Sequence, residues 1–166
     1  MNSKKDSARN IDSLDVKMAI EMVEKYFGFL IEEYQFAYDG RFVFTSPKVR
    51  IEMGIGHKTP RIYIHRVGEP DFTNMILEVV ILYFEGKLPK INFEVHPLEH
   101  NIKFMAKVLR DRARKIMNDI DEWWIPVQLY HYKKAEKKYK DRHQLEGFLS
   151  SYKRNHDYLK SKGAIE

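Results

Sequence analysis

Hydrophobic positions change their spacing twice along this chain of 166 residues. Between residues 14 and 34 apolar side chains recur every three or four positions, as in an amphipathic helix. Between 41 and 67 they alternate with polar ones, as in strands with one buried face. From Asp71 onward the helical spacing returns. The pattern predicts an α+β fold: an N-terminal helix, a three-stranded antiparallel meander, a buried central helix and a long C-terminal helical segment.

The first predicted helix begins after Ser13, a residue type favoured at helix N-caps, and runs to about Tyr34. Gly28 lies inside this stretch and is expected to break it. Residues 1–13 are mostly polar, which predicts a disordered arm ahead of a single domain over residues 14–166.

The strands are expected over residues 42–44, 49–55 and 62–64, with Ser46-Pro47 and Gly56 to Pro60 as the turns. The central helix is expected over residues 71–86, capped by Asp71 and stopped by Gly86. The β-branched run at 79–81 leaves a strand over 76–84 as an alternative.

Alternation at Ile91, Phe93 and Val95 predicts a short edge strand. A long helix is expected from Pro97 to Pro126, and one or two basic helices over 127–140 and 142–160.

Composition narrows the class of protein. The chain has no cysteine, which excludes disulfides and thiolate metal sites and fits a reducing cytoplasm. The longest apolar run, residues 79–84, is too short to cross a bilayer, so we expect a soluble protein without a membrane partner. The residue pattern suggests no cofactor. Of the formal net charge of +5, the C-terminal part carries the excess: ten Lys or Arg stand against four Asp or Glu between Lys133 and Lys162.

One motif suggests a metal. His96-Pro-Leu-Glu-His100 matches the H-x-x-E-H spacing of zinc proteases, in which both histidines share one helical face. Pro97 places His96 at or before the start of the helix. We therefore expect a capping histidine and an exposed one, and no metal site.

A second motif suggests a nuclease. Pro70-Asp71, followed by Glu85-Gly-Lys87, resembles the PD-(D/E)xK superfamily of metal-dependent nucleases. The resemblance implies that Asp71 and Glu85 hold a divalent ion and that Lys87 steadies the nucleophile. A helix over 71–86 would separate the two acids by about 20 Å, too far for one metal, so we expect Asp71 to cap the helix instead.

Two surfaces suggest binding. The basic tail interleaves tyrosines with Lys133, Lys134, Lys137, Lys138 and Arg142, a mixture that fits nucleic acid or an acidic protein. The open face of the meander is expected to display, among other polar residues, a rigid set able to dock an acidic partner: Arg50, Arg61, Tyr63 and His65.

The segment from Phe27 to Phe36, the alternating meander and the apolar central helix together resemble small bacterial immunity proteins over residues 14–85. The resemblance implies a protein that neutralises a toxin by direct binding, without chemistry of its own. Many immunity proteins are acidic, whereas this chain is basic, which implies a partner with an acidic contact surface. Our leading hypothesis is thus a non-enzymatic protein-binding module; the alternatives are a nucleic-acid-binding protein and the nuclease.

Overall fold

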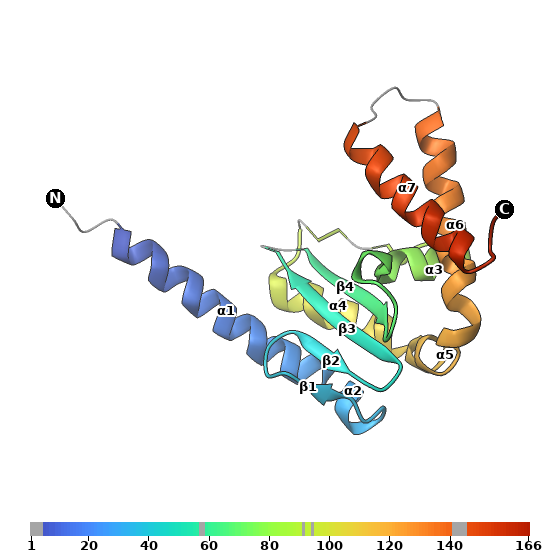
Figure 1. Ribbon diagram of the computed structural model, residues 1–166. Helices are drawn as coiled ribbons and strands as arrows, with labels where there is room; N and C mark the ends of the chain where they lie inside the picture. Colours follow the sequence, from blue (N-terminus) through green and yellow to red (C-terminus); the bar gives the residue numbers. More distant parts are fainter. Residues whose placement is uncertain (1–4, 57–58, 91, 94, 141–145) are drawn as a thin grey trace.

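The computed structural model describes residues 5–56, 59–90, 92–93, 95–140 and 146–166 (Figure 1). Within these ranges the helices and strands follow the expected α+β order. They are α1 (Lys5–Phe27), α2 (Phe29–Glu32), β1 (Ala37–Tyr38), β2 (Val43–Thr45), β3 (Val49–Ile55), β4 (Pro60–Arg66), the 3-10 helix η1 (Asp71–Thr73), β5 (Met75–Ile76), α3 (Leu77–Glu85), α4 (Leu98–Arg110), α5 (Ala113–Asn118), α6 (Ile120–Lys140) and α7 (Glu146–Ser161).

The strands form one antiparallel sheet in the order β1-β2-β3-β4-β5. Its centre is the pair β3 and β4, which are in register from Val49 opposite Arg66 to Ile55 opposite Pro60. The predicted three-stranded meander is confirmed, and a two-residue strand extends it at each edge.

The core lies on one side of this sheet. Ile51, Ile62 and Ile64 point to that side and are almost fully buried. In Figure 1, α4 lies behind β3 and β4, and α1 crosses the same side with its N-terminal turns pointing away from the body. The α6–α7 hairpin lies at the other end, where α6 contacts α3 (Figure 1). The other side of the sheet is therefore left for the solvent or a partner.

The start of the first helix differs from the prediction. The helix α1 begins at Lys5, so Ser13 lies within the helix and not at its start. Of the expected disordered arm, residues 1–4 lie outside the described residues. The break at Gly28 is confirmed: α1 ends at Phe27 and α2 begins at Phe29.

The central helix is shorter than predicted. Leu77–Glu85 is helical and ends at Gly86 with φ 70°, as expected, so the strand alternative for 76–84 is wrong for residues 77–84. Asp71, however, begins the 3-10 helix and caps no α-helix. Met75 and Ile76 pair with β4 because its edge offers backbone partners at Ile64 and Tyr63. Strand pairing has overridden the helical spacing there.

The long third helix is in fact interrupted. The helix α4 ends at Arg110, because Arg112 adopts φ −119° and ψ −3° and turns its guanidinium back to the Val108 carbonyl, 3.0 Å away. A second break falls at Asp119. Pro126 does not end a helix but lies inside α6. Burial of the neighbouring Trp124 and Val127 outweighs the cost of the proline, about 3 kcal/mol.

The predicted edge strand is wrong for Phe93 and Val95, which lie in turns, while Ile91 lies outside the described residues. The edge of β4 that such a strand could have joined is occupied in part by β5.

Candidate partner-binding face

Alternation along β3 and β4 places the polar residues of both strands on the side opposite the core. Arg50 stands opposite His65, Glu52 opposite Tyr63, and Gly54 opposite Arg61. The 3-10 helix η1, which follows β4, adds Asp71. We call the six polar residues of this group the sheet-face patch: Arg50, Glu52, Arg61, Tyr63, His65 and Asp71. The four sheet residues predicted to act together are thus brought together.

Arg50 is the centre of the patch. Its Nη2 atom donates to Asp71 Oδ1 at 2.9 Å and lies 3.1 Å from His65 Nδ1. The side chain of Arg50 is 36% exposed and that of Asp71 is 84% exposed. The sequence pattern predicted a capping role for Asp71 and not this ion pair, which depends on the loop that returns η1 to the sheet.

His65 is buried, although it lies on the outer side of the sheet. A guanidinium only donates, so Nδ1 accepts from Arg50 and the ring proton resides on Nε2. That atom lies 3.5 Å from Glu52 Oε2. Burial, and then the charge of Arg50, lower the pKa of His65, against the opposing charges of Glu52 and Asp71. The imidazole is therefore held neutral at physiological pH.

Tyr63 and Arg61 form the more open half of the patch. A Cβ atom on Gly54 would lie 3.0 Å from Tyr63 Cε2, so the tyrosine ring leans across the glycine. Arg61 is exposed and makes no ion pair with the described residues. It presents an uncompensated cation beside an aromatic ring.

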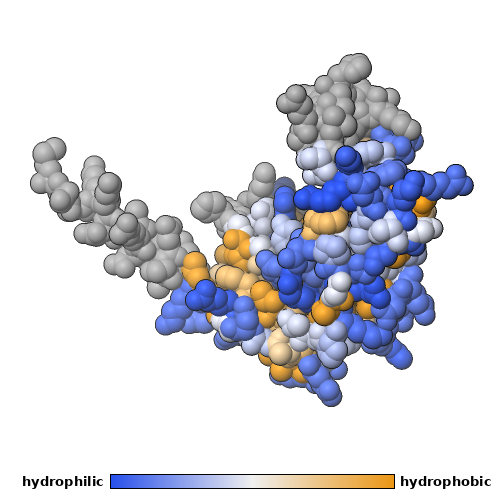
Figure 2. All heavy atoms as spheres, viewed as in Figure 1, coloured by the Kyte–Doolittle hydropathy of each residue, from blue (hydrophilic) through white to orange (hydrophobic). Residues whose placement is uncertain are grey.

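The described helices leave this face open. The helices α1 and α4 contact each other, and α4 contacts β4 from the core side. Figure 2, drawn from the same direction as Figure 1, shows this side of the molecule as mainly hydrophilic with a few apolar residues. Within the described residues the C-terminal helices α6 and α7 do not cover this face, because they lie beside the sheet (Figure 1).

The basic cluster lies on α6, away from the patch. Lys133, Lys134, Lys137 and Lys138 are exposed, and Lys134 Nζ lies 4.7 Å from the centre of the Tyr130 ring. Arg142, the fifth predicted member, lies outside the described residues.

The nuclease candidates have separate partners. Both carboxylate oxygens of Glu85 accept from Arg112, at 2.5 Å and 2.9 Å, and this hydrogen-bonded pair lowers the pKa of Glu85. Asp71 is paired with Arg50 on the sheet face. Glu85 ends a helix and Asp71 begins a 3-10 helix, so they do not lie on neighbouring strands as the nuclease motif requires. Lys87 follows α3 and is exposed.

His96 and His100 stack with their ring centres 4.3 Å apart. His96 precedes Pro97, which is itself the N-cap of α4, so the expected capping role of His96 is wrong. His100 lies in the first turn and is exposed, as expected. Asn101 is buried and donates to the carbonyls of Phe93 and His96. No group of three His, Asp or Glu with metal-binding geometry occurs in the part of the chain that the structure describes.

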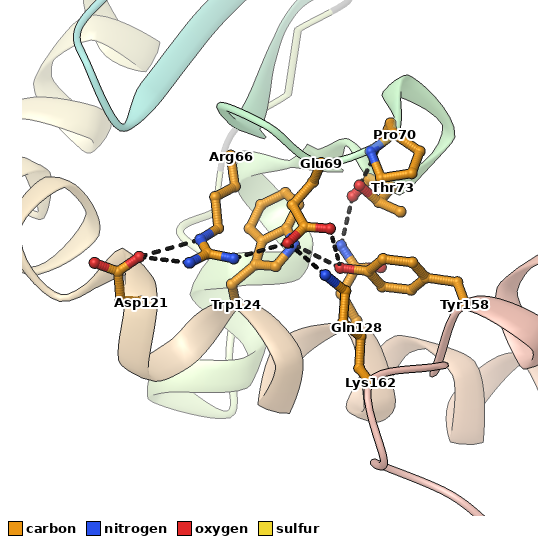
Figure 3. A network of polar contacts seen from close by, with 9 residues as sticks. All are labelled: Arg66, Glu69, Pro70, Thr73, Asp121, Trp124, Gln128, Tyr158 and Lys162. Atoms are coloured by element: carbon orange, nitrogen blue, oxygen red, sulfur yellow. Dashed lines mark hydrogen bonds and ion pairs between the residues drawn. The ribbon is translucent and has the colours of Figure 1, made fainter. Parts of the chain in front are cut away.

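A second polar network, which sequence reasoning missed, joins the hairpin to the sheet (Figure 3). Glu69 is its centre: it accepts from Arg66 at 2.8 Å, from Lys162 at 2.9 Å and from the Tyr158 hydroxyl at 3.0 Å. Burial opposes ionisation of Glu69, but the hydrogen bonds from Lys162 and Tyr158 outweigh it and lower its pKa. Arg66 is only three residues from Glu69, but Tyr158 and Lys162 come from the other end of the chain and leave no local sequence signal.

Three further residues of the network lie on α6 and also connect it to the sheet side or to α7. Arg66 also forms two hydrogen bonds with Asp121 Oδ1, at 3.1 Å and 2.7 Å. Trp124 Nε1 donates to the Tyr158 hydroxyl at 3.1 Å, and Gln128 donates to the Thr73 carbonyl. All its described members have protein partners, which indicates a structural role (Figure 3).

Comparisons of the chain with protein-family models, curated proteins and solved structures found no match. Among the described helices, none combines the length and apolarity needed to cross a bilayer.

Proposed function

We propose that this protein is a non-enzymatic binding module that docks a protein partner on the sheet-face patch. The observation that carries the proposal is an open sheet face on which charged side chains are already held in place. Arg50 is fixed between Asp71 and His65 before any partner arrives. Little side-chain freedom is then lost on binding, which favours affinity.

The chemistry of the partner follows from the charges that remain unpaired. Arg50 is neutralised by Asp71, and Lys48 at the start of the face is paired with Asp121. Arg61 is left exposed beside Tyr63. Tyrosine and arginine are enriched where interfaces gain most of their energy. The partner accordingly places a carboxylate against Arg61 and a flat apolar group against Tyr63.

The resemblance to immunity proteins supplies the biological setting of the proposal. An immunity or inhibitor protein blocks a toxin by covering it, so it needs a rigid face and no reactive group of its own. The absence of cysteine supports a cytoplasmic location. The partner is a bacterial toxin with an acidic contact surface.

The test compares two charge reversals against one and the same protein partner that has an acidic contact surface. Arg61→Glu places like charges together at a rigid position, and we expect it to weaken binding at least ten-fold in a calorimetric titration, about 1.4 kcal/mol. Lys137→Glu makes the same change of charge on α6, and we expect it to alter mainly the association rate and the salt dependence.

Equal losses for the two variants, or a larger loss for Lys137→Glu, would move the binding site to the hairpin. Unchanged affinity in both would remove both surfaces. Melting curves of the two variants serve as the control for folding, because both positions are exposed.

A further inference from the structure

A second surface lies where α3 meets α6, and the sheet-face proposal does not use it. An open hollow of about 320 Å³ is present there. Its lining is mostly apolar and comes from Tyr83 on α3 and from one side of α6: Ile125, Pro126, Leu129, Tyr130 and Lys133. The volume is at the lower end of the range for small-molecule sites, about 300–1,000 Å³.

Two tyrosines form its aromatic part. The rings of Tyr83 and Tyr130 meet edge to face, with centres 5.6 Å apart and planes at 64°. Both side chains are only half-buried, so part of each ring remains available. Lys134 Nζ lies 4.7 Å from the Tyr130 ring centre, which places a cation directly beside the aromatic surface.

A row of cations continues from the hollow along α6. Residues three, four and seven positions after Tyr130 are Lys133, Lys134 and Lys137, so all lie on the same side of the helix. None of these three lysines has a carboxylate partner within the described residues. Glu136, by contrast, accepts from the Tyr152 hydroxyl on α7. Positive charge therefore accumulates uncompensated on the solvent side.

We propose that these five residues, the aromatic–lysine strip of Tyr83, Tyr130, Lys133, Lys134 and Lys137, bind single-stranded nucleic acid. One unstacked base enters the hollow and packs on the tyrosines, while the neighbouring phosphates contact the lysines. Single-strand binding sites combine these two elements, an aromatic surface and a positively charged track. A duplex keeps its bases stacked and would use only the lysines. This activity is separate from the sheet-face patch and does not depend on it.

The experiment measures fluorescence anisotropy of a labelled oligo-dT of about 16 nucleotides, the upper end of common single-strand site sizes. The full chain should bind it more tightly than a duplex of equal length. Tyr130→Ala should weaken oligo-dT binding about ten-fold, the loss of one base–aromatic stack, whereas Tyr130→Phe should retain it. Lys137→Gln should reduce the slope of log affinity against log salt by about 0.7, one phosphate contact.

Lys17→Gln is the matched control, since Lys17 is an exposed lysine on α1; it should leave the salt slope unchanged. Equal binding of duplex and single strand, or full affinity in Tyr130→Ala, would overturn the proposal in favour of diffuse attraction. Equally tight binding of poly-glutamate would assign the strip to an acidic protein instead. A melting curve of Tyr130→Ala matching that of Tyr130→Phe shows that any loss arises at the binding surface.

Discussion

The hydrogen bond between Arg50 and His65 depends on whether the imidazole ring is protonated. In the neutral ring Nδ1 accepts from Arg50; a proton on that atom would face the guanidinium 3.1 Å away and break the contact. The groups that face the ring are Arg50 and Glu52 from β3 and Asp71 from η1. The Arg50–His65 contact is thus made only while Nδ1 of His65 carries no proton.

Acidification should therefore destabilise the protein through His65. The pKa of His65 in the folded protein lies below the unfolded value of 6.5. Between these two pKa values the unfolded chain binds more protons than the folded one, so the free energy of unfolding falls as the pH falls. His65→Gln can still accept from Arg50 but does not titrate. We expect chemical denaturation to show a smaller loss of unfolding free energy between about pH 7 and pH 5 in this variant than in the native protein. An identical pH dependence in both would contradict the assignment.

Among the helices and strands, the sequence pattern predicted those that depend on the local spacing of apolar residues. It missed those that depend on contacts with distant parts of the chain. The alternation from Val49 to Ile55 was sufficient for β3, because burial of one face has a period of two. The pairing of Met75 with Ile64 depends on an edge eleven residues earlier in the chain, and helical spacing conceals it. The same limit applies to the site: Arg50 and His65 were placed by alternation, but the Asp71 contact was not.

The predicted central position of α3 in the core can be tested by a substitution in that helix. Val80 is fully buried, so Val80→Asp should leave a buried, unpaired carboxylate. The cost is several kcal/mol, comparable with the whole stability of about 5–15 kcal/mol, and we expect the variant to be unfolded by circular dichroism. Val67→Asp is the same substitution at a residue that is 47% exposed and should melt like the native protein. A folded Val80→Asp with an unchanged melting temperature would show that α3 is not central.

At the scale of the whole molecule, Glu69 joins the sheet to the end of the chain. Arg66 belongs to β4, whereas Tyr158 and Lys162 come from α7 and the residue after it. The carboxylate is only 6% exposed, so removing it leaves three donors around an unfilled site. The hairpin, which carries every member of the aromatic–lysine strip except Tyr83, is held to the body through this network (Figure 3).

Glu69→Gln should lower the unfolding free energy by about 2 kcal/mol, less than a fully buried pair because Arg66 and Lys162 are partly exposed. The folded pKa of Glu69 is lowered, so its contribution is present above the ordinary value of 4.5 and is lost as the pH falls through the folded pKa. The difference between variant and native protein should thus be largest near neutral pH and smaller below about pH 4. Glu122→Gln is the control: Glu122 is exposed and follows Asp121 directly in the sequence. This variant should show no such difference.

Binding of a protein partner at the sheet-face patch can be mapped residue by residue. Titration of isotope-labelled protein with the unlabelled partner, followed by amide and side-chain NMR shifts, locates the contact surface. We expect the largest changes at Arg50, Arg61, Tyr63 and His65, with smaller ones along α6. If the largest changes instead fall on Lys133 to Lys138 and the strands of the sheet are unaffected, the sheet-face patch is not the site.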